Sequence, residues 1–114
     1  MHIEIYCNLY ISETLQDKKD KIVKKLKANK LQPSIYIITL SQGEQNHLEF
    51  FSSVLLKHHV FDHNELFVVG IANGYDEALF LVKTIAEDVY KETGTTEIRK
   101  ELLAKQSQKK EYER

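Results

Sequence analysis

Two short runs of this chain are apolar on both faces of a strand, and they constrain its fold more than any other feature. They are SIYIITL over residues 34–40 and ELFVVGIA over residues 65–72. Strands of this kind are typical of sheets that helices cover on both sides, as in parallel α/β proteins. The chain therefore needs helices for each face of a central sheet.

Strand and helix patterns alternate along the rest of the sequence. Residues 2–11 alternate strictly between apolar and polar side chains, which predicts a half-buried strand. Pro33 is the only proline and ends the first helical pattern, and Gly94 is typical of the stop of the last one. The three long segments with the apolar period of a helix are residues 12–31, 44–61 and 75–92.

The predicted order is therefore β-α-β-α-β-α, with a short C-terminal helix over residues 96–104. Strands that alternate with helices favour a small open three-stranded parallel α/β sheet with flanking helices, Rossmann-like in general architecture. We expect one α/β domain over residues 1–104 and a disordered polar tail over residues 105–114. The strand order stays open: doubly wound sheets put the first strand in the middle, but its polar face favours an edge.

Composition limits the compartment and the partners. The 114 residues carry a net charge of −1, which argues against a general nucleic-acid binder. Cys7 is the only cysteine, so no intramolecular disulfide can form, and its place on the apolar face of the first strand predicts burial. Without a signal-peptide pattern or a long apolar span, we expect a cytoplasmic protein with no membrane contact. The two edges of a small sheet favour a homodimer or another protein partner.

Ligands of open parallel sheets bind at the carboxyl ends of the strands. That rule selects three loops, over residues 11–14, 40–47 and 72–78, which we expect to converge on one rim. The predicted ligand-binding side chains are the polar ones of these loops: Ser12, Ser41, Gln42, Asn46, His47, Asn73, Tyr75 and Asp76.

The catalytic candidates on this rim form an incomplete set. His47 lies in the first turn of the second predicted helix, and beside Asp76 or Glu77 it would serve as a general base. No full nucleophile and base constellation can be assembled from the sequence. It therefore favours a non-catalytic α/β module that self-associates, or that binds a protein or a small polar ligand at the rim. A small enzyme for hydrolysis or proton transfer, using His47 with these acids, is the alternative.

The glycines near the third loop do not match a cofactor motif. Gly70 and Gly74 have the spacing G-x-x-x-G, whereas a dinucleotide fingerprint needs G-x-G-x-x-G. Asp76 and Glu77 follow in the first turn of the predicted helix, where they would repel a phosphate. The sequence predicts no cofactor, and its rim acids favour a cation, an amine or a sugar.

Two further patterns support weaker hypotheses. His59 and His63 have the i,i+4 spacing of a zinc site, but the helix is expected to end near Phe61, and we predict no metal. Residues 17–30 hold seven lysines and two aspartates, without arginine or aromatic residues. Nucleic-acid binding through this helix is a third, disfavoured hypothesis, and a solvated helix face is the preferred interpretation.

Overall fold

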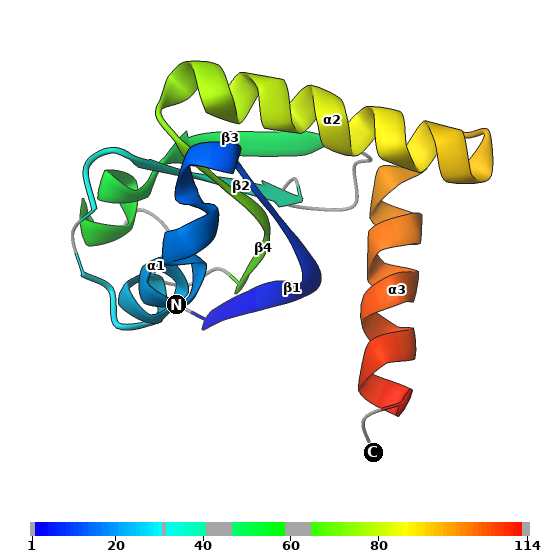
Figure 1. Cartoon of the computed structure of the whole chain (residues 1–114). Helices are drawn as coiled ribbons and strands as arrows, with labels where there is room; N and C mark the ends of the chain where they lie inside the picture. Colours follow the sequence, from blue (N-terminus) through cyan, green and yellow to red (C-terminus); the bar gives the residue numbers. More distant parts are fainter. Residues whose placement is uncertain (1, 31, 41–46, 59–64, 113–114) are drawn as a thin grey trace.

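A single mixed sheet with the strand order β1-β4-β2-β3 forms the centre of the molecule. The computed structural model describes residues 2–30, 32–40, 47–58 and 65–112 (Figure 1). The elements in chain order are β1 (His2–Ile11), the 3₁₀ helix η1 (Glu13–Lys18), α1 (Lys19–Lys27), β2 (Ile35–Leu40), β3 (Leu48–Ser52), the 3₁₀ helix η2 (Ser53–His58), β4 (Glu65–Asn73), α2 (Tyr75–Thr93) and α3 (Ile98–Tyr112).

The α/β class is confirmed, but the predicted three-stranded parallel sheet is wrong. Only β1 and β4 are parallel, while β2 runs antiparallel to β4, and β3 runs antiparallel to β2. The expected helix over residues 44–61 is the cause of the error. Residues 48–52 form strand β3, with Leu48 opposite Leu40. A short apolar run fits a helix or a strand equally well, and the pairing with β2 decides between them.

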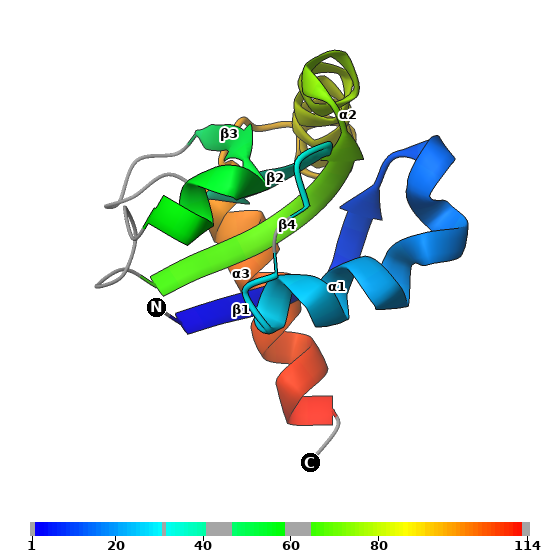
Figure 2. The same ribbon diagram turned by 90° about the vertical axis from the view of Figure 1, so that its left-hand side faces the viewer.

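Helices cover both faces of the sheet, as the doubly apolar strands predict. The inner side of α2 packs on one face through Ala78, Leu81 and Ile85. On the other face, Ile22 and Leu26 of α1 pack with residues of η1 and η2. Figures 1 and 2 show α2 along one side of the strands and α1 on the other. The core thus has two halves, with the sheet between them.

The alternation of β1 breaks in its middle. Ile5 pairs with Val68 and Tyr10 pairs with Gly70, so four residues of β1 face one residue of β4 between these pairs. The break turns Cys7 toward the α2 face, while Ile5 stays on the α1 face. The predicted strict alternation, with Cys7 on the face of Ile5, is therefore wrong at this position. Leu9 and Ile11 are again on the face of Ile5, so the irregularity changes the direction of Cys7 alone among the apolar residues described in β1.

The helices match the predictions to different degrees. The helix expected over residues 75–92 is confirmed as α2, and Gly94 follows it with a φ of 71°. The segment predicted as a helix over residues 12–31 begins as a 3₁₀ turn and ends earlier, at Lys27. The last helix extends from Ile98 to Tyr112, beyond the predicted range of 96–104, because Leu102 and Gln106 pack against the body of the protein. No helix in the described part of the chain is long and apolar enough to cross a bilayer.

Candidate functional site

The carboxyl ends of β1 and β4 lie side by side, because these two strands are parallel. The backbone N–H of Ser12 donates to the carbonyl of Ile71 at 3.1 Å. The N–H of Asn73 donates to Oγ of Ser12 at 3.3 Å. Two of the three loops selected from the sequence, over residues 11–14 and 72–78, therefore meet at one end of the sheet.

Leu40 and His47, the described residues that flank the third loop, lie at the other end of the sheet. Since β2 is antiparallel to β4, Ile35 pairs with Asn73 at one end and Leu40 pairs with Leu48 at the other. Five residue-to-residue steps along β2 separate these ends by about 17 Å. The predicted residues Ser41, Gln42 and Asn46 lie outside the described residues.

His47 stands next to β3 at the far end, and its Nε2 is 3.8 Å from a carboxylate oxygen of Glu49. Its side chain is half exposed. The structure thus does not bring His47 to Asp76 or Glu77, the acids with which it was expected to act. The antiparallel direction of β2 is the physical reason, because it places Leu40 and the start of β3 at the end of the sheet away from the rim of β1 and β4.

Tyr75 and Asn73 do not lie with the other predicted ligand-binding residues. The ring of Tyr75 packs against Phe50 and Tyr36, with centroid distances of 5.4 and 6.3 Å. It therefore lies over β2 and β3. Asn73 lines a separate pocket on the other side of η1.

A crevice of about 640 Å³ opens between η1 and the first turns of α2. We call it the acidic crevice, because its charged side chains are the carboxylates of Glu13, Asp76 and Glu77, and no basic side chain of the described residues lines it. Phe80 stands at its edge with 69% of its surface exposed. The lining residues are Tyr10, Ile11, Ser12, Glu13, Thr14, Gln16, Asp76, Glu77, Phe80, Leu81 and Thr84.

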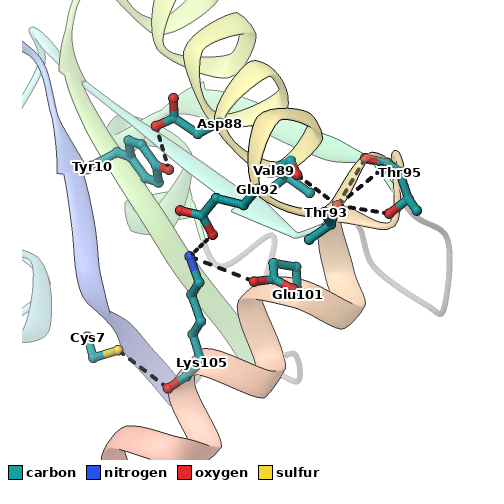
Figure 3. A network of polar contacts seen from close by, with 9 residues as sticks. All are labelled: Cys7, Tyr10, Asp88, Val89, Glu92, Thr93, Thr95, Glu101 and Lys105. Carbon is teal, nitrogen blue, oxygen red and sulfur yellow. Dashed lines mark hydrogen bonds and ion pairs between the residues drawn. The ribbon is translucent and has the colours of Figure 1, made fainter.

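Hydrogen bonds fix the walls of this crevice. The hydroxyl of Thr14 donates to Oε1 of Glu77 at 2.8 Å, which joins η1 to α2. The hydroxyl of Tyr10 donates to Oδ2 of Asp88 at 2.9 Å, as Figure 3 shows. Burial and this contact with a carboxylate raise the pKa of Tyr10 above its ordinary value. At neutral pH the phenol is therefore protonated, and its O–H is occupied in the hydrogen bond to Asp88.

A second group of polar contacts ties α3 to the body behind this site. Lys105 reaches from α3 to Glu92 of α2, and it also lies 3.8 Å from Glu101 (Figure 3). Sγ of Cys7 lies 3.9 Å from the carbonyl of Lys105. The bond to Glu92 raises the pKa of Lys105. This network holds α3 against β1 and α2.

Several residues of the crevice were not selected from the sequence. Phe80 and Thr84 follow Asp76 at helical spacings of four residues, so their common side of α2 was available as a signal. Tyr10 lies on the polar face of β1 that the alternation predicts, but the sequence does not show that α2 covers this face. Gln16 belongs to a 3₁₀ turn that no local pattern predicts.

The zinc hypothesis drawn from the histidine spacing is not tested by the structure. His59 and His63 lie outside the described residues. Within the described ranges, no group of three or more His, Cys, Asp or Glu side chains is placed to hold a metal ion.

Comparison of the chain with protein-family models, curated proteins and solved structures found no match. The function of the chain therefore has to be inferred from the geometry of its own side chains.

Proposed function

We propose that this protein is a non-catalytic binding module that takes a small, positively charged organic ligand into the acidic crevice. The observation that carries the proposal is the composition of the lining. Three carboxylates and one exposed aromatic ring face the same space, without a basic side chain among the described residues. The crevice also lies at the carboxyl ends of a parallel strand pair, where α/β proteins bind their ligands.

The charges and the apolar surface select an amine with an organic part. Carboxylates of one sign along a cleft raise the local concentration of cations. The exposed face of Phe80 adds a cation–π contact worth about 0.5–1 kcal/mol at such a site. Ile11 and Leu81 contribute apolar surface to the same crevice, which suits the hydrocarbon part of the ligand.

The geometry favours binding over catalysis. Ser12 is buried and its Oγ accepts a hydrogen bond from Asn73, while the phenol of Tyr10 donates to Asp88. His47 lies at the other end of the sheet. A nucleophile activated by a base is therefore not assembled from the described residues of the crevice.

Titration with matched amines and acids tests the proposal. We expect phenethylamine to shift the backbone amide signals of Ser12 and Thr84, and 3-phenylpropionate, which has a similar shape and the opposite charge, to leave them unchanged. The double variant Glu13→Gln/Asp76→Asn should weaken amine binding by about tenfold, since each 1.4 kcal/mol of lost attraction is one decade. Glu77 is left intact, because it also holds Thr14.

The control removes the same charge elsewhere. Glu87→Gln/Glu97→Gln neutralises two exposed carboxylates outside the crevice and should bind phenethylamine as the unmodified protein does. Equal binding of the amine and the acid, or equal weakening in both double variants, would contradict the proposal.

Self-association is a second candidate, favoured by one side of α2. Tyr75, Leu79 and Tyr90 fall on the same side of this helix and are 51–59% exposed. Large apolar side chains gathered on one surface are typical of protein contacts. Sedimentation of the protein and of a Leu79→Lys variant tests this: a dimer that the substitution dissociates supports the proposal, and a monomer at high concentration refutes it.

A further inference from the structure

A second pocket lies on the opposite side of the η1–α1 segment from the acidic crevice. Its volume is about 390 Å³. Asn73 lines this pocket and donates its N–H to Ser12, which lines the acidic crevice. We call it the basic pocket, because all of its charged side chains are lysines. Its lining residues are Leu15, Lys18, Lys21, Ile22, Lys25, Gln32, Pro33, Ser34, Ile35 and Asn73.

The three lysines share one side of the helical segment. Lys18 ends η1, and Lys21 and Lys25 follow on α1 at spacings of three and four residues, which stack them on one face. No carboxylate of the described residues lines the pocket or pairs with any of them. Asp20, the nearest acid on α1, lines a different crevice with the lysines of the other side. The positive charge of the pocket is therefore not neutralised within it.

Hydrogen bonds to backbone carbonyls hold the wall that faces these lysines. The N–H of Gly74 donates to the carbonyl of Ser34 at 2.8 Å, which ties this wall to the end of β4. The buried Gln32 donates from Nε2 to the carbonyl of Ile22 at 3.4 Å, and its own carbonyl accepts from the hydroxyl of Ser53 at 2.6 Å. The pocket thus has a fixed wall and a fixed distance to α1, so its polar groups need little rearrangement to meet a ligand.

We propose that the basic pocket binds the phosphate group of a small organic molecule. Lysine ammonium groups act as compact point charges, and three of them around one space match an anion that carries more than one charge. A single carboxylate would leave most of that charge unbalanced. Leu15, Ile22 and Ile35 supply apolar surface for the organic part.

This proposal goes beyond the cation-binding function and also revises the view of the rim as one site. From the sequence, Asp76 and Glu77 were expected to disfavour a phosphate at the rim. In the structure these acids line the acidic crevice, while the lysines of η1 and α1 line the basic pocket. The end of the parallel strand pair therefore serves two spaces of opposite charge.

The lysines of α1 are divided between two faces, which provides a matched control. Lys19, Lys24 and Lys27 line the other crevice, beside β1. The test variant Lys18→Gln/Lys21→Gln/Lys25→Gln and the control variant Lys19→Gln/Lys24→Gln/Lys27→Gln lose the same charge from the same segment. Glutamine has nearly the helix propensity of lysine, so both variants should keep α1. Circular dichroism and urea unfolding verify that they are folded.

The probes are inorganic pyrophosphate and phenyl phosphate, with calorimetry and the amide signals of Ser34 and Asn73 as readouts. We expect both probes to bind the unmodified protein and the control variant alike. The test variant should bind about tenfold more weakly or worse, because several charge-assisted contacts are lost. That pattern supports the proposal.

Three results would overturn it. The first is no binding of either probe to the unmodified protein. The second is equal weakening in the test and control variants, which would mean attraction by the total charge of the helix. The third is an oligonucleotide that binds more tightly than both probes and is weakened by both variants, which would assign the lysines to a nucleic-acid backbone.

Discussion

The side chain of Gln106 makes hydrogen bonds with the backbone of Cys7 and Ile5 that a neighbouring strand would otherwise make. Its Oε1 accepts a hydrogen bond from the backbone N–H of Cys7 at 2.7 Å, and its Nε2 donates one to the carbonyl of Ile5 at 3.3 Å. In a parallel ladder, one residue makes this same pair of bonds with the residues on either side of its partner. Gln106 of α3 thus pairs with β1 across Tyr6, where the register between β1 and β4 is broken.

Replacing Gln106 should destabilise the protein by about 1–3 kcal/mol, because it leaves the N–H of Cys7 and the carbonyl of Ile5 without partners in a partly buried place. We expect Gln106→Ala to lower the urea midpoint and to accelerate hydrogen exchange at the Cys7 amide. Gln108→Ala, an exposed position on the same helix, is the control and should change neither. An unchanged rate of hydrogen exchange at the Cys7 amide in Gln106→Ala would show that the side chain of Gln106 does not protect this amide.

The contact of Gln106 also shows where sequence reasoning reaches its limit. The strands β2 and β4 and the helix α2 follow from local patterns, such as the alternation of Phe67 and Val69 against Leu66 and Val68. Gln106 lies 99 residues from Cys7, in a segment whose composition predicts a polar tail. The role of Gln106 depends on the irregular register of β1, which the alternating sequence of this strand does not predict.

The candidate site divides in the same way. The loops after β1 and β4 could be placed together from the sequence, since the strand-end rule holds for parallel strands. It failed for the segment after β2, because β2 runs antiparallel to β4 and its carboxyl end at Leu40 therefore lies at the opposite end of the sheet. The opposite charges of the two pockets could not be predicted from the sequence, because they depend on which sides of η1 and α1 the neighbouring segments cover.

The bond between Tyr10 and Asp88 predicts a loss of stability at alkaline pH. The pKa of Tyr10 is raised, chiefly by burial and then by Asp88, while in the unfolded chain the phenol ionises near its ordinary value of about 10. Above that pH the folded state holds more protons than the unfolded state, so stability falls as pH rises. Lys105, whose pKa is also raised, acts in the same direction.

Tyr10→Phe should therefore show a shallower decline of unfolding free energy between about pH 9 and 11. Urea titrations across this range measure the slope. Tyr90→Phe, which removes a phenol that is 59% exposed on α2, is the matched control. Equal slopes in the unmodified protein and both variants would rule out a contribution from the Tyr10 phenol.

Thr39 offers a stabilising substitution. It lies in β2 at 0% exposure, and its hydroxyl has no hydrogen-bond partner among the described residues. Burial of an unpaired hydroxyl is unfavourable, so Thr39→Val should raise the unfolding free energy by about 1 kcal/mol. Thr84→Val is the control, because the Thr84 hydroxyl donates to the carbonyl of Phe80 at 3.0 Å and its removal should bring no gain. A Thr39→Val variant no more stable than the unmodified protein would mean that the hydroxyl has a partner.

Gly70 of β4 is crowded by Leu81 of α2 and by Ile38 of the neighbouring strand β2. A methyl group at this position would lie 3.1 Å from Cδ1 of Ile38 and 3.2 Å from Cδ2 of Leu81. Gly70→Ala should therefore cost about 1–3 kcal/mol through overpacking. Leu81→Ala alone also destabilises, by leaving a cavity.

The double variant Gly70→Ala/Leu81→Ala separates crowding from other causes. Removal of the Leu81 side chain makes room for the new methyl group, so the double variant should be more stable than the sum of the single effects predicts. The same cycle with Gly94→Ala is the control. Gly94 has a φ of 71° and no atom of the described residues within 4 Å of a new methyl group, so its cost is backbone strain that Leu81 does not relieve. Additive effects in both cycles would mean that Gly70 is not kept small by its contact with α2.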